Sequence, residues 1–145
     1  MHIEIERDPP ADIAKQLSQG IIDFNRSSIP GLEPNEAEIR FHALARNGSG
    51  ELIGGLRASC YWNTLHIELL WLSEVARGSG AGTRLINQAE LFAREQGCER
   101  GLVETTSWQA RPFYEKCGYE LMATLEGRPK GYATHYLGKW LNTSA

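Results

Sequence analysis

Cysteine is scarce in this sequence, and its three copies suggest neither a disulfide framework nor a metal cluster. Cys60, Cys98 and Cys117 are the three among 145 residues, and they form no C-x-x-C pair. An odd number of unpaired thiols indicates a reducing, cytoplasmic compartment. The four histidines are scattered without the spacing of metal ligands, so we expect no metal site.

Long apolar runs and long basic runs are missing as well. No stretch of about 18 apolar residues and no leader pattern occurs, so we expect no membrane-spanning segment. The formal net charge of −3, without a basic stripe, argues against a nucleic-acid partner and leaves room for a cationic substrate. With 41% hydrophobic residues, the chain is predicted to form one domain, residues 1–145, with its own core.

Two widespread phosphate-binding motifs are also absent. A Walker loop needs G-x-x-x-x-G-K-[ST], and the chain contains no Gly-Lys-Ser or Gly-Lys-Thr. The dinucleotide fingerprint needs G-x-G-x-x-G, whereas Gly78, Gly80 and Gly82 place the third glycine one residue early. The sequence therefore excludes both of these nucleotide-binding loops.

A different anion site is predicted at residues 77–83, between an apolar segment ending at Leu72 and a helical pattern. The stretch reads Arg77, Gly78, Ser79, Gly80, Ala81, Gly82 and Thr83. Small residues leave backbone N–H groups unshielded, and the first N–H groups of a helix have no intrahelical partner. Together with the helix dipole and the Arg77 guanidinium, such a turn suits a diphosphate. The alternative is a glycine-rich turn that only caps the helix.

The first half of the chain is expected to hold four strands and one helix. Alternating residues predict a short strand over residues 2–6, and Pro9-Pro10 ends it. A helix is expected from about Ala11, with Ile13, Leu17, Ile21 and Phe24 on one face. Further strands are expected over residues 38–45, 51–61 and 65–72, the first two joined by a hairpin at Asn47-Gly48.

The second half should complete a mixed sheet. We expect a helix from about Gly80 to Gly97, a short helix over residues 109–116, and strands over residues 100–105, 119–125 and 135–141. Hairpins followed by a strand–helix–strand crossover predict an α+β fold, with a mixed, mostly antiparallel sheet of six to seven strands and flanking helices. Strands 65–72 and 100–105 should be parallel neighbours, with the glycine-rich stretch at the carboxyl end of the first, where ligands bind in such sheets.

Two motifs resemble those of the GNAT superfamily of N-acetyltransferases. Arg-x-x-Gly-x-Gly at residues 77–82 resembles its acyl-CoA-binding signature. Residues 107–119, SWQARPFYEKCGY, resemble a second segment, with matching positions at Ala110, Tyr114, Glu115, Lys116, Gly118 and Tyr119. A small, bacterial-type subgroup is similar further, through Tyr61-Trp62, Glu68-Leu69-Leu70-Trp71, Gln109 and Phe113-Tyr114. The resemblance spans about residues 52–141 and agrees with the predicted order of elements.

This resemblance implies acetyl-CoA as co-substrate, with its diphosphate on residues 77–83. It also implies that backbone N–H groups of Leu70, Trp71 and Leu72, near a bulge, hold the acetyl thioester. The acyl slot would be set by packing around Leu70 and Phe113. Ser107 stands where many relatives have Asn beside the pantetheine arm, and its hydroxyl would replace part of that contact.

Two side chains are candidates for the chemistry. Tyr114 corresponds to the residue that protonates the departing coenzyme thiolate in such enzymes. The alternative for Tyr114 is a core aromatic with a satisfied hydroxyl. Glu68 corresponds to a carboxylate that takes the acceptor's proton, directly or through water; the alternatives are an anchor for a cationic substrate and a carboxylate paired with an arginine. Strand alternation places Glu68 on one face with His66, Leu70 and Leu72.

The acceptor side is predicted less sharply. Tyr61, Trp62 and Trp108 are candidates for cation–π contact with an amine, against the alternative of core packing. Glu33 lies in the loop that encloses the acceptor in the superfamily. The predicted function is acetyl transfer from acetyl-CoA to a primary amine of a small molecule, by direct attack in a ternary complex. The alternatives are a peptide or protein N-acetyltransferase and a non-catalytic acyl-CoA-binding module, and a homodimer is possible.

Overall fold

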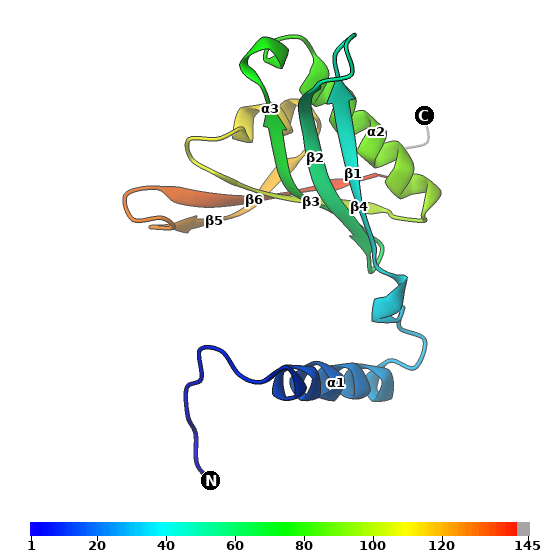
Figure 1. Ribbon diagram of the computed structural model, residues 1–145, viewed down its shortest axis with the longest axis vertical. Coiled ribbons are helices and arrows are strands. Elements are labelled where there is room, and N and C mark those ends of the chain that lie inside the picture. The colour runs from blue at the N-terminus through cyan, green and yellow to red at the C-terminus, as the bar shows by residue number, and fades with distance from the viewer. Residues whose placement is uncertain (142–145) are drawn as a thin grey trace. The chain divides into compact units, whose positions relative to one another are not determined.

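The computed structural model describes residues 1–141 and divides the chain into two units (Figure 1). The first unit comprises residues 1–36, and the second begins at Ala37. The expectation of a single domain over the whole chain stays a prediction.

The first unit contains one long helix. Helix α1 spans Ala11–Ser28 and begins directly after Pro10, as expected. The expected strand over residues 2–6 is wrong, because the structure assigns no strand there. A strand needs a neighbouring backbone to satisfy its N–H and C=O groups, and residues 2–6 pair with no strand in the described chain. Alternation at His2–Glu6 therefore did not suffice to form a strand.

The second unit is built on a six-stranded mixed sheet, which confirms the predicted fold class. Its order is β1 (Ile39–Arg46), β2 (Leu52–Tyr61), β3 (Thr64–Leu72), β4 (Arg100–Thr106), β6 (Ala133–Trp140) and β5 (Glu120–Glu126). Every neighbouring pair is antiparallel except β3 with β4, the crossover pair. The β1–β2 hairpin turns at residues 47–50, where the Asn47 side-chain oxygen accepts hydrogen bonds from the N–H groups of Ser49 and Glu51.

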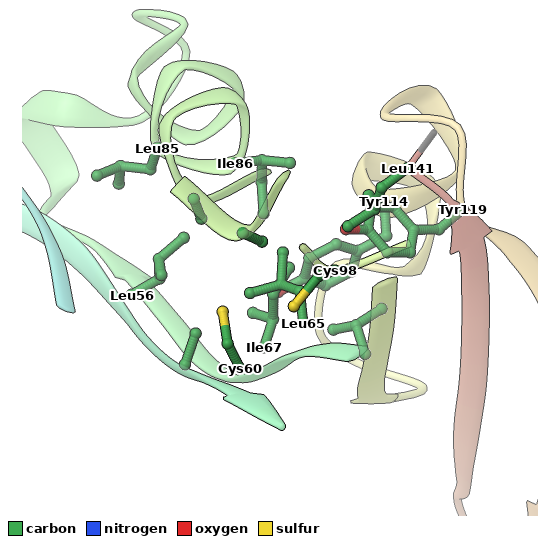
Figure 2. Packing of buried hydrophobic residues seen from close by; sticks show 14 of the residues in the cluster. Leu56, Cys60, Leu65, Ile67, Leu85, Ile86, Cys98, Tyr114, Tyr119 and Leu141 are labelled. Atoms are coloured by element: carbon green, nitrogen blue, oxygen red, sulfur yellow. The ribbon is translucent and has the colours of Figure 1, made fainter. Parts of the chain in front are cut away.

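One face of this sheet carries the hydrophobic core, together with helices α2 (Ala81–Glu95) and α3 (Arg111–Lys116). Helix α2 packs on β1, β2 and β3 (Figure 1). Figure 2 shows Ile86 of α2 and Tyr114 of α3 pointing into a common cluster with strand residues. We call this side of the sheet the core face and the opposite side the outer face. The largest fully buried side chains are Leu56, Leu65, Ile67, Ile86, Val103, Tyr119, Thr134, Leu137 and Leu141.

A β-bulge in β3 corrects the predicted alternation. Ile67 pairs with Ala58, but the next pair joins Leu69 to Arg57, so Glu68 is an extra residue. The bulge reverses the faces beyond it: Leu70 and Leu72 pack against the core on the same side as Ile67. Leu70 and Leu72 therefore do not share a face with His66, because a single inserted residue flips every side chain that follows.

The core predicts a contrast between two positions on α2. Ile86 is fully buried, whereas Leu91 is 48% exposed on the same helix. Ile86→Ala should lower the free energy of unfolding by about 2–5 kcal/mol, because it removes packed atoms and leaves a cavity. Leu91→Ala, the matched control, should lower it by less than about 1 kcal/mol. Urea denaturation measures both, and equal losses would contradict the assigned helix orientation.

Candidate functional site

The site begins where strands β3 and β4 separate. Their parallel ladder joins only residues 64–67 to residues 100–103. Strand β3 continues to Leu72 and β4 to Thr106, but beyond Ile67 and Val103 the described chain shows no further pairing between them. The backbone polar groups along that edge of residues 68–72 are thus left for a ligand. Leu70 and Leu72 lie half-buried beside the core there, and Trp71 is exposed on the outer face.

The glycine-rich loop follows at the end of β3. Gly78 and Gly80 adopt φ angles of 73° and 86°, in the left-handed region that glycine enters without strain. Within residues 1–141, the N–H groups of Gly78, Gly80, Gly82 and Thr83 donate no hydrogen bond. Four open amides at the amino end of α2, a helix of 15 residues, make an anion-binding concavity.

Two side chains shape this loop from within. The Ser79 hydroxyl donates a hydrogen bond to the Ala76 carbonyl and accepts one from the Ala81 N–H at 3.3 Å. The Arg77 side chain folds back, and its Nε donates to the Leu72 carbonyl at 3.3 Å. Its guanidinium therefore stands where the loop meets the end of β3, and its predicted contact with an anion stays a prediction.

Gly82 serves a different purpose from the other two glycines. A Cβ atom at Gly82 would lie 3.1 Å from the Phe113 ring and 3.5 Å from the Leu72 side chain. The absence of a side chain thus lets α3 approach the first turn of α2. The structure brings Phe113 and Leu72 together beside Gly82, and their predicted contacts with the coenzyme stay predictions.

A hollow of about 490 Å³ adjoins the loop, between it and residues of β1, β2 and α2. Ser79 and Ala81 line it together with Arg46 of β1 and Arg84 of α2. These two arginines were not singled out from the sequence. The signal was weak, since Arg46 lies about 30 residues earlier and only the sheet register brings it to the loop.

Tyr114 lies on the core side of this arrangement. Its side chain is 5% exposed, and its ring meets those of Phe113 and Tyr119 edge-on, at centroid distances of 5.2 and 6.2 Å. Burial, with a smaller contribution from the nearby Cys117 thiol, raises the pKa of Tyr114 to about 12. The hydroxyl is therefore protonated at neutral pH. Hydroxyl bonds of tyrosine to other side chains within residues 1–141 involve Tyr119 and Tyr136 and not Tyr114. The catalytic role of Tyr114 and its alternative, a core aromatic, both stay predictions.

Glu68 is the bulge residue itself. It is exposed, and one of its carboxylate oxygens lies 2.6 Å from Nε of Arg57 on the neighbouring strand. Arg57 was missed from the sequence. The β2–β3 hairpin held the signal, because pairs such as Tyr61 with Thr64 and Ala58 with Ile67 extrapolate to Arg57 opposite Glu68.

Ser107 and Trp108 stand where β4 leads into α3. The Ser107 hydroxyl accepts a hydrogen bond from the Ala133 N–H at 2.7 Å and donates one to its carbonyl at 3.1 Å. This clamp leaves Ser107 only one lone pair for any other contact. Trp108 packs edge-on against Tyr132 of the β5–β6 hairpin, at a centroid distance of 5.2 Å. Both aromatic rings are about half exposed.

Two predicted acceptor residues, Tyr61 and Trp62, are not brought to the loop. Tyr61 and Trp62 stack on each other at 4.8 Å in the β2–β3 turn, at the opposite end of β3 from Gly78. Nine strand residues separate the two ends, roughly 25–30 Å at about 3.3 Å per residue. Glu33 belongs to the first unit, residues 1–36. Among the three aromatic residues predicted for the acceptor, Trp108 is the one that follows directly on β4, the strand that borders the opening.

Two features are absent from the part of the chain that the structure describes. No helix in residues 1–141 is long and apolar enough to cross a membrane. The same residues contain no group of three or more His, Cys, Asp or Glu side chains placed to hold a metal ion.

The geometry agrees with comparisons to known proteins. Residues 10–119 match the model of the acetyltransferase (GNAT) family. A blasticidin-S acetyltransferase from Streptomyces morookaense is 42% identical over 113 residues, covering 77% of this chain and 82% of the relative. An acetyltransferase from Bacillus cereus, solved at 1.9 Å, is 30% identical with a TM-score of 0.82 over 97% of both chains.

A third comparison concerns the ligand. A Bacillus anthracis protein crystallised in complex with acetyl coenzyme A is 27% identical, with a TM-score of 0.62 over 74% of this chain and 64% of that one. The site that opens between β3 and β4 is thus found on the fold of an acetyl-CoA-dependent family. The chain belongs to the GNAT family of acetyltransferases.

Proposed function

We propose that the protein transfers the acetyl group of acetyl-CoA to a primary amine of a small molecule, by direct attack in a ternary complex. The separation of β3 from β4, ending at a loop of open N–H groups, is the observation that carries this proposal. The 42% identical relative, a blasticidin-S acetyltransferase, supports a small-molecule acceptor.

Purified protein should release coenzyme A from acetyl-CoA only when an amine acceptor is present. Binding of acetyl-CoA without such release would favour a non-catalytic module.

The loop residues are proposed to hold the diphosphate of acetyl-CoA. Residues 77–83 offer four open N–H groups and the Arg77 guanidinium to an anion. Arg46 and Arg84 add positive charge in the adjoining hollow.

A charge reversal in the loop tests this proposal. Gly80→Glu places a carboxylate at the amino end of α2, so acetyl-CoA affinity should fall at least about 100-fold through repulsion and lost amide contacts. Gly97→Glu is the matched control, because Gly97 has a φ of 87°, similarly open surroundings, and lies just past the carboxyl end of the same helix. Calorimetric titration should show near-normal affinity for the control. Equal affinities for the two variants would contradict the proposed diphosphate site.

The end of β3 is proposed to stabilise the reacting carbonyl. Successive N–H groups along a strand point to opposite edges, and the Ser73 N–H donates to Ile53 of β2. Within residues 70–72, the N–H groups of Leu70 and Leu72 therefore face the unpaired edge, where a developing oxyanion gains most from fixed donors.

An acetyl-cysteine intermediate is disfavoured by the thiols themselves. Cys60 and Cys98 are buried in the core, and burial raises the pKa of Cys117, which keeps it protonated. These facts support direct attack by the amine.

Tyr114 is proposed to donate a hydrogen bond to the leaving sulfur. Its pKa of about 12 keeps the proton available, but an ordinary thiol has a pKa near 8.5, so complete transfer to a free thiolate is uphill. The hydroxyl therefore serves best while negative charge is developing on sulfur in the transition state. Its lack of a partner in the described chain leaves it ready for that contact.

Replacing Tyr114 by Phe separates this role from packing. The change keeps the ring and removes only the hydroxyl, so kcat should fall about 100-fold while acetyl-CoA affinity stays within about twofold. Steady-state kinetics and calorimetry measure the two effects. Tyr61→Phe, at the distant β2–β3 turn, is the control and should leave kcat unchanged. Unchanged turnover in the Tyr114 variant would remove the proposed role.

The acceptor is proposed to approach on the outer face. The ladder between β3 and β4 ends at Ile67 and Val103, and Glu68 and Glu104 are the next residues of the two strands. Both carboxylates therefore stand where the opening begins. Arg57 neutralises part of the first, and Arg128 lies 3.6 Å from the second. An ammonium group would be attracted to this pair, with Trp108 and Tyr132 available for cation–π contact. Glu68, the bulge residue, is proposed to bind the ammonium group and take its proton.

The pH dependence of a Glu68→Gln variant tests the last step. Gln keeps the volume but cannot accept the proton, so kcat/KM should fall about 100-fold or more and lose its acidic limb. Glu126→Gln, at the exposed end of β5, is a control that should behave as the natural protein. A variant that retains the acidic limb and shows only a higher acceptor KM would make Glu68 an anchor and not the base.

A further inference from the structure

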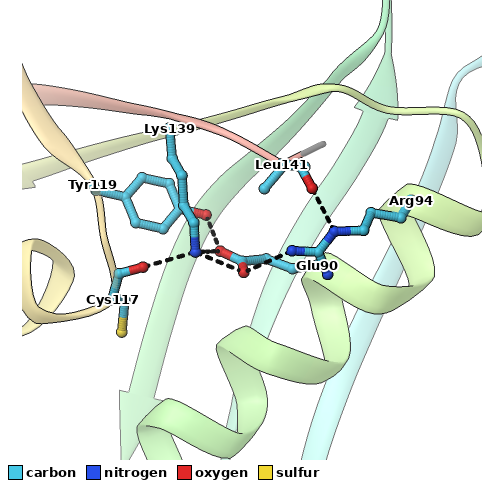
Figure 3. Close-up of polar contacts among 6 residues, drawn as sticks. All are labelled: Glu90, Arg94, Cys117, Tyr119, Lys139 and Leu141. Atoms are coloured by element: carbon cyan, nitrogen blue, oxygen red, sulfur yellow. Dashed lines mark hydrogen bonds and ion pairs between the residues drawn. The ribbon is translucent and has the colours of Figure 1, made fainter. Parts of the chain in front are cut away.

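A network of charges lies under helix α2, away from the glycine-rich loop. Glu90 of α2 is only 2% exposed, and Lys139 of β6 places its ammonium 2.9 and 3.1 Å from the two carboxylate oxygens (Figure 3). The Tyr119 hydroxyl donates to the same carboxylate at 2.9 Å. Arg94 completes the set from the solvent side, 3.8 Å away. We call Glu90, Lys139 and Tyr119 the anchor.

The anchor fixes the carboxyl end of α3. The Lys139 ammonium also donates to the Cys117 carbonyl at 2.8 Å, one of the last carbonyls of that helix. Figure 3 shows Lys139 between this carbonyl and Glu90, so one side chain ties α3 to α2. A cation at a helix carboxyl end also suits the helix dipole.

Two glycines make room for the anchor. A Cβ atom at Gly101 of β4 would lie 2.8 Å from the Tyr119 hydroxyl, and one at Gly118 would lie 3.3 Å from the Lys139 side chain. Burial, followed by the charge and hydrogen bond of Glu90, raises the pKa of Tyr119, so its hydroxyl remains a donor to that carboxylate. Surrounding residues thus hold the Tyr119 ring in one place.

Buried charge pairs seldom add net stability, because desolvation offsets their attraction. In this protein the anchor instead fixes geometry, because Tyr119 contacts Tyr114 through both its backbone and its ring. The Tyr119 N–H donates to the Tyr114 carbonyl at 3.0 Å, and the Tyr119 ring packs edge-on against the Tyr114 ring. The Tyr114 hydroxyl, proposed to donate a hydrogen bond to the leaving sulfur, therefore stands on a ring that Tyr119 supports from behind.

We propose that Glu90, Lys139 and Tyr119 are positioning residues for Tyr114, holding α3 and the Tyr114 ring so that its hydroxyl meets the leaving sulfur. None of the three touches the glycine-rich loop, so they act on turnover and not on acetyl-CoA binding. The inference rests on the proposed function, in which Tyr114 acts on the sulfur.

A double-mutant comparison tests it with the full chain. Tyr119→Phe removes the bond to Glu90 and keeps the ring, so kcat should fall about tenfold, while acetyl-CoA affinity should stay within about twofold, as expected for a small misplacement of a catalytic group. The same change made in a Tyr114→Phe background should lower kcat no further. Thr134→Val removes another buried hydroxyl bond, on the outer face, and should affect kcat equally in both backgrounds.

Three outcomes are distinguishable. A loss seen only with Tyr114 present supports the positioning role. Equal losses in both backgrounds, or no loss in either, would overturn that role while leaving the Tyr114 chemistry intact. Natural turnover in Tyr114→Phe alone would overturn the proposed chemistry and the inference with it. Gly101→Ala displaces the same hydroxyl by a different route and should repeat the Tyr119→Phe result, and calorimetric acetyl-CoA binding verifies that each variant is folded.

Discussion

A parallel ladder of four residue pairs carries the functional architecture of this protein. Residues 64–67 of β3 bind residues 100–103 of β4, and everything that forms the site begins where this ladder stops. The Glu68 bulge lies at that point, and beyond it β3 stays paired with β2 but no longer with β4. The proposed function uses unpaired backbone donors beside a helix amino end, and the interruption of the ladder leaves such donors on β3 next to the loop that leads into α2.

Helices α2 and α3 hold the two sides of the opening in a fixed relation. Gly82 lets Phe113 approach the first turn of α2, and Lys139 ties the end of α3 to Glu90 two turns further along. The Phe113 ring makes an apolar contact with α2, and the Cys117 carbonyl accepts a hydrogen bond from the Lys139 ammonium. Helix α3 is therefore held at two points. The short helix thus places Tyr114 without needing stability of its own, which six residues would not provide.

Much of this arrangement could be predicted from the sequence, and the failures have physical causes. Glycine spacing and helical periodicity located the start of α2 to within about a residue and its end to within two, because both depend on local chain geometry. Local patterns also gave the order strand, helix, strand over residues 65–105, and this order predicted the parallel crossover. The bulge was not predicted at Glu68, since an inserted residue has no signature in alternation. The positions of Trp62 and Arg57 depend on the register of the β2–β3 hairpin. Trp62 lies in its turn, far from the loop, and the pairing of the strands brings Arg57 beside Glu68.

The sheet order gives the short ladder a further meaning in folding. Strands β1, β2 and β3 form one antiparallel leaf, and β4, β6 and β5 form another, with α2 as the long connection between them. Contacts within each leaf are close in sequence, whereas the ladder joins residues about 36 positions apart, and distant contacts close more slowly. Neither leaf contains the opening by itself. The proposed acetyl-CoA site therefore forms only when the two leaves join, so that assembly of the sheet and formation of the proposed site are one event.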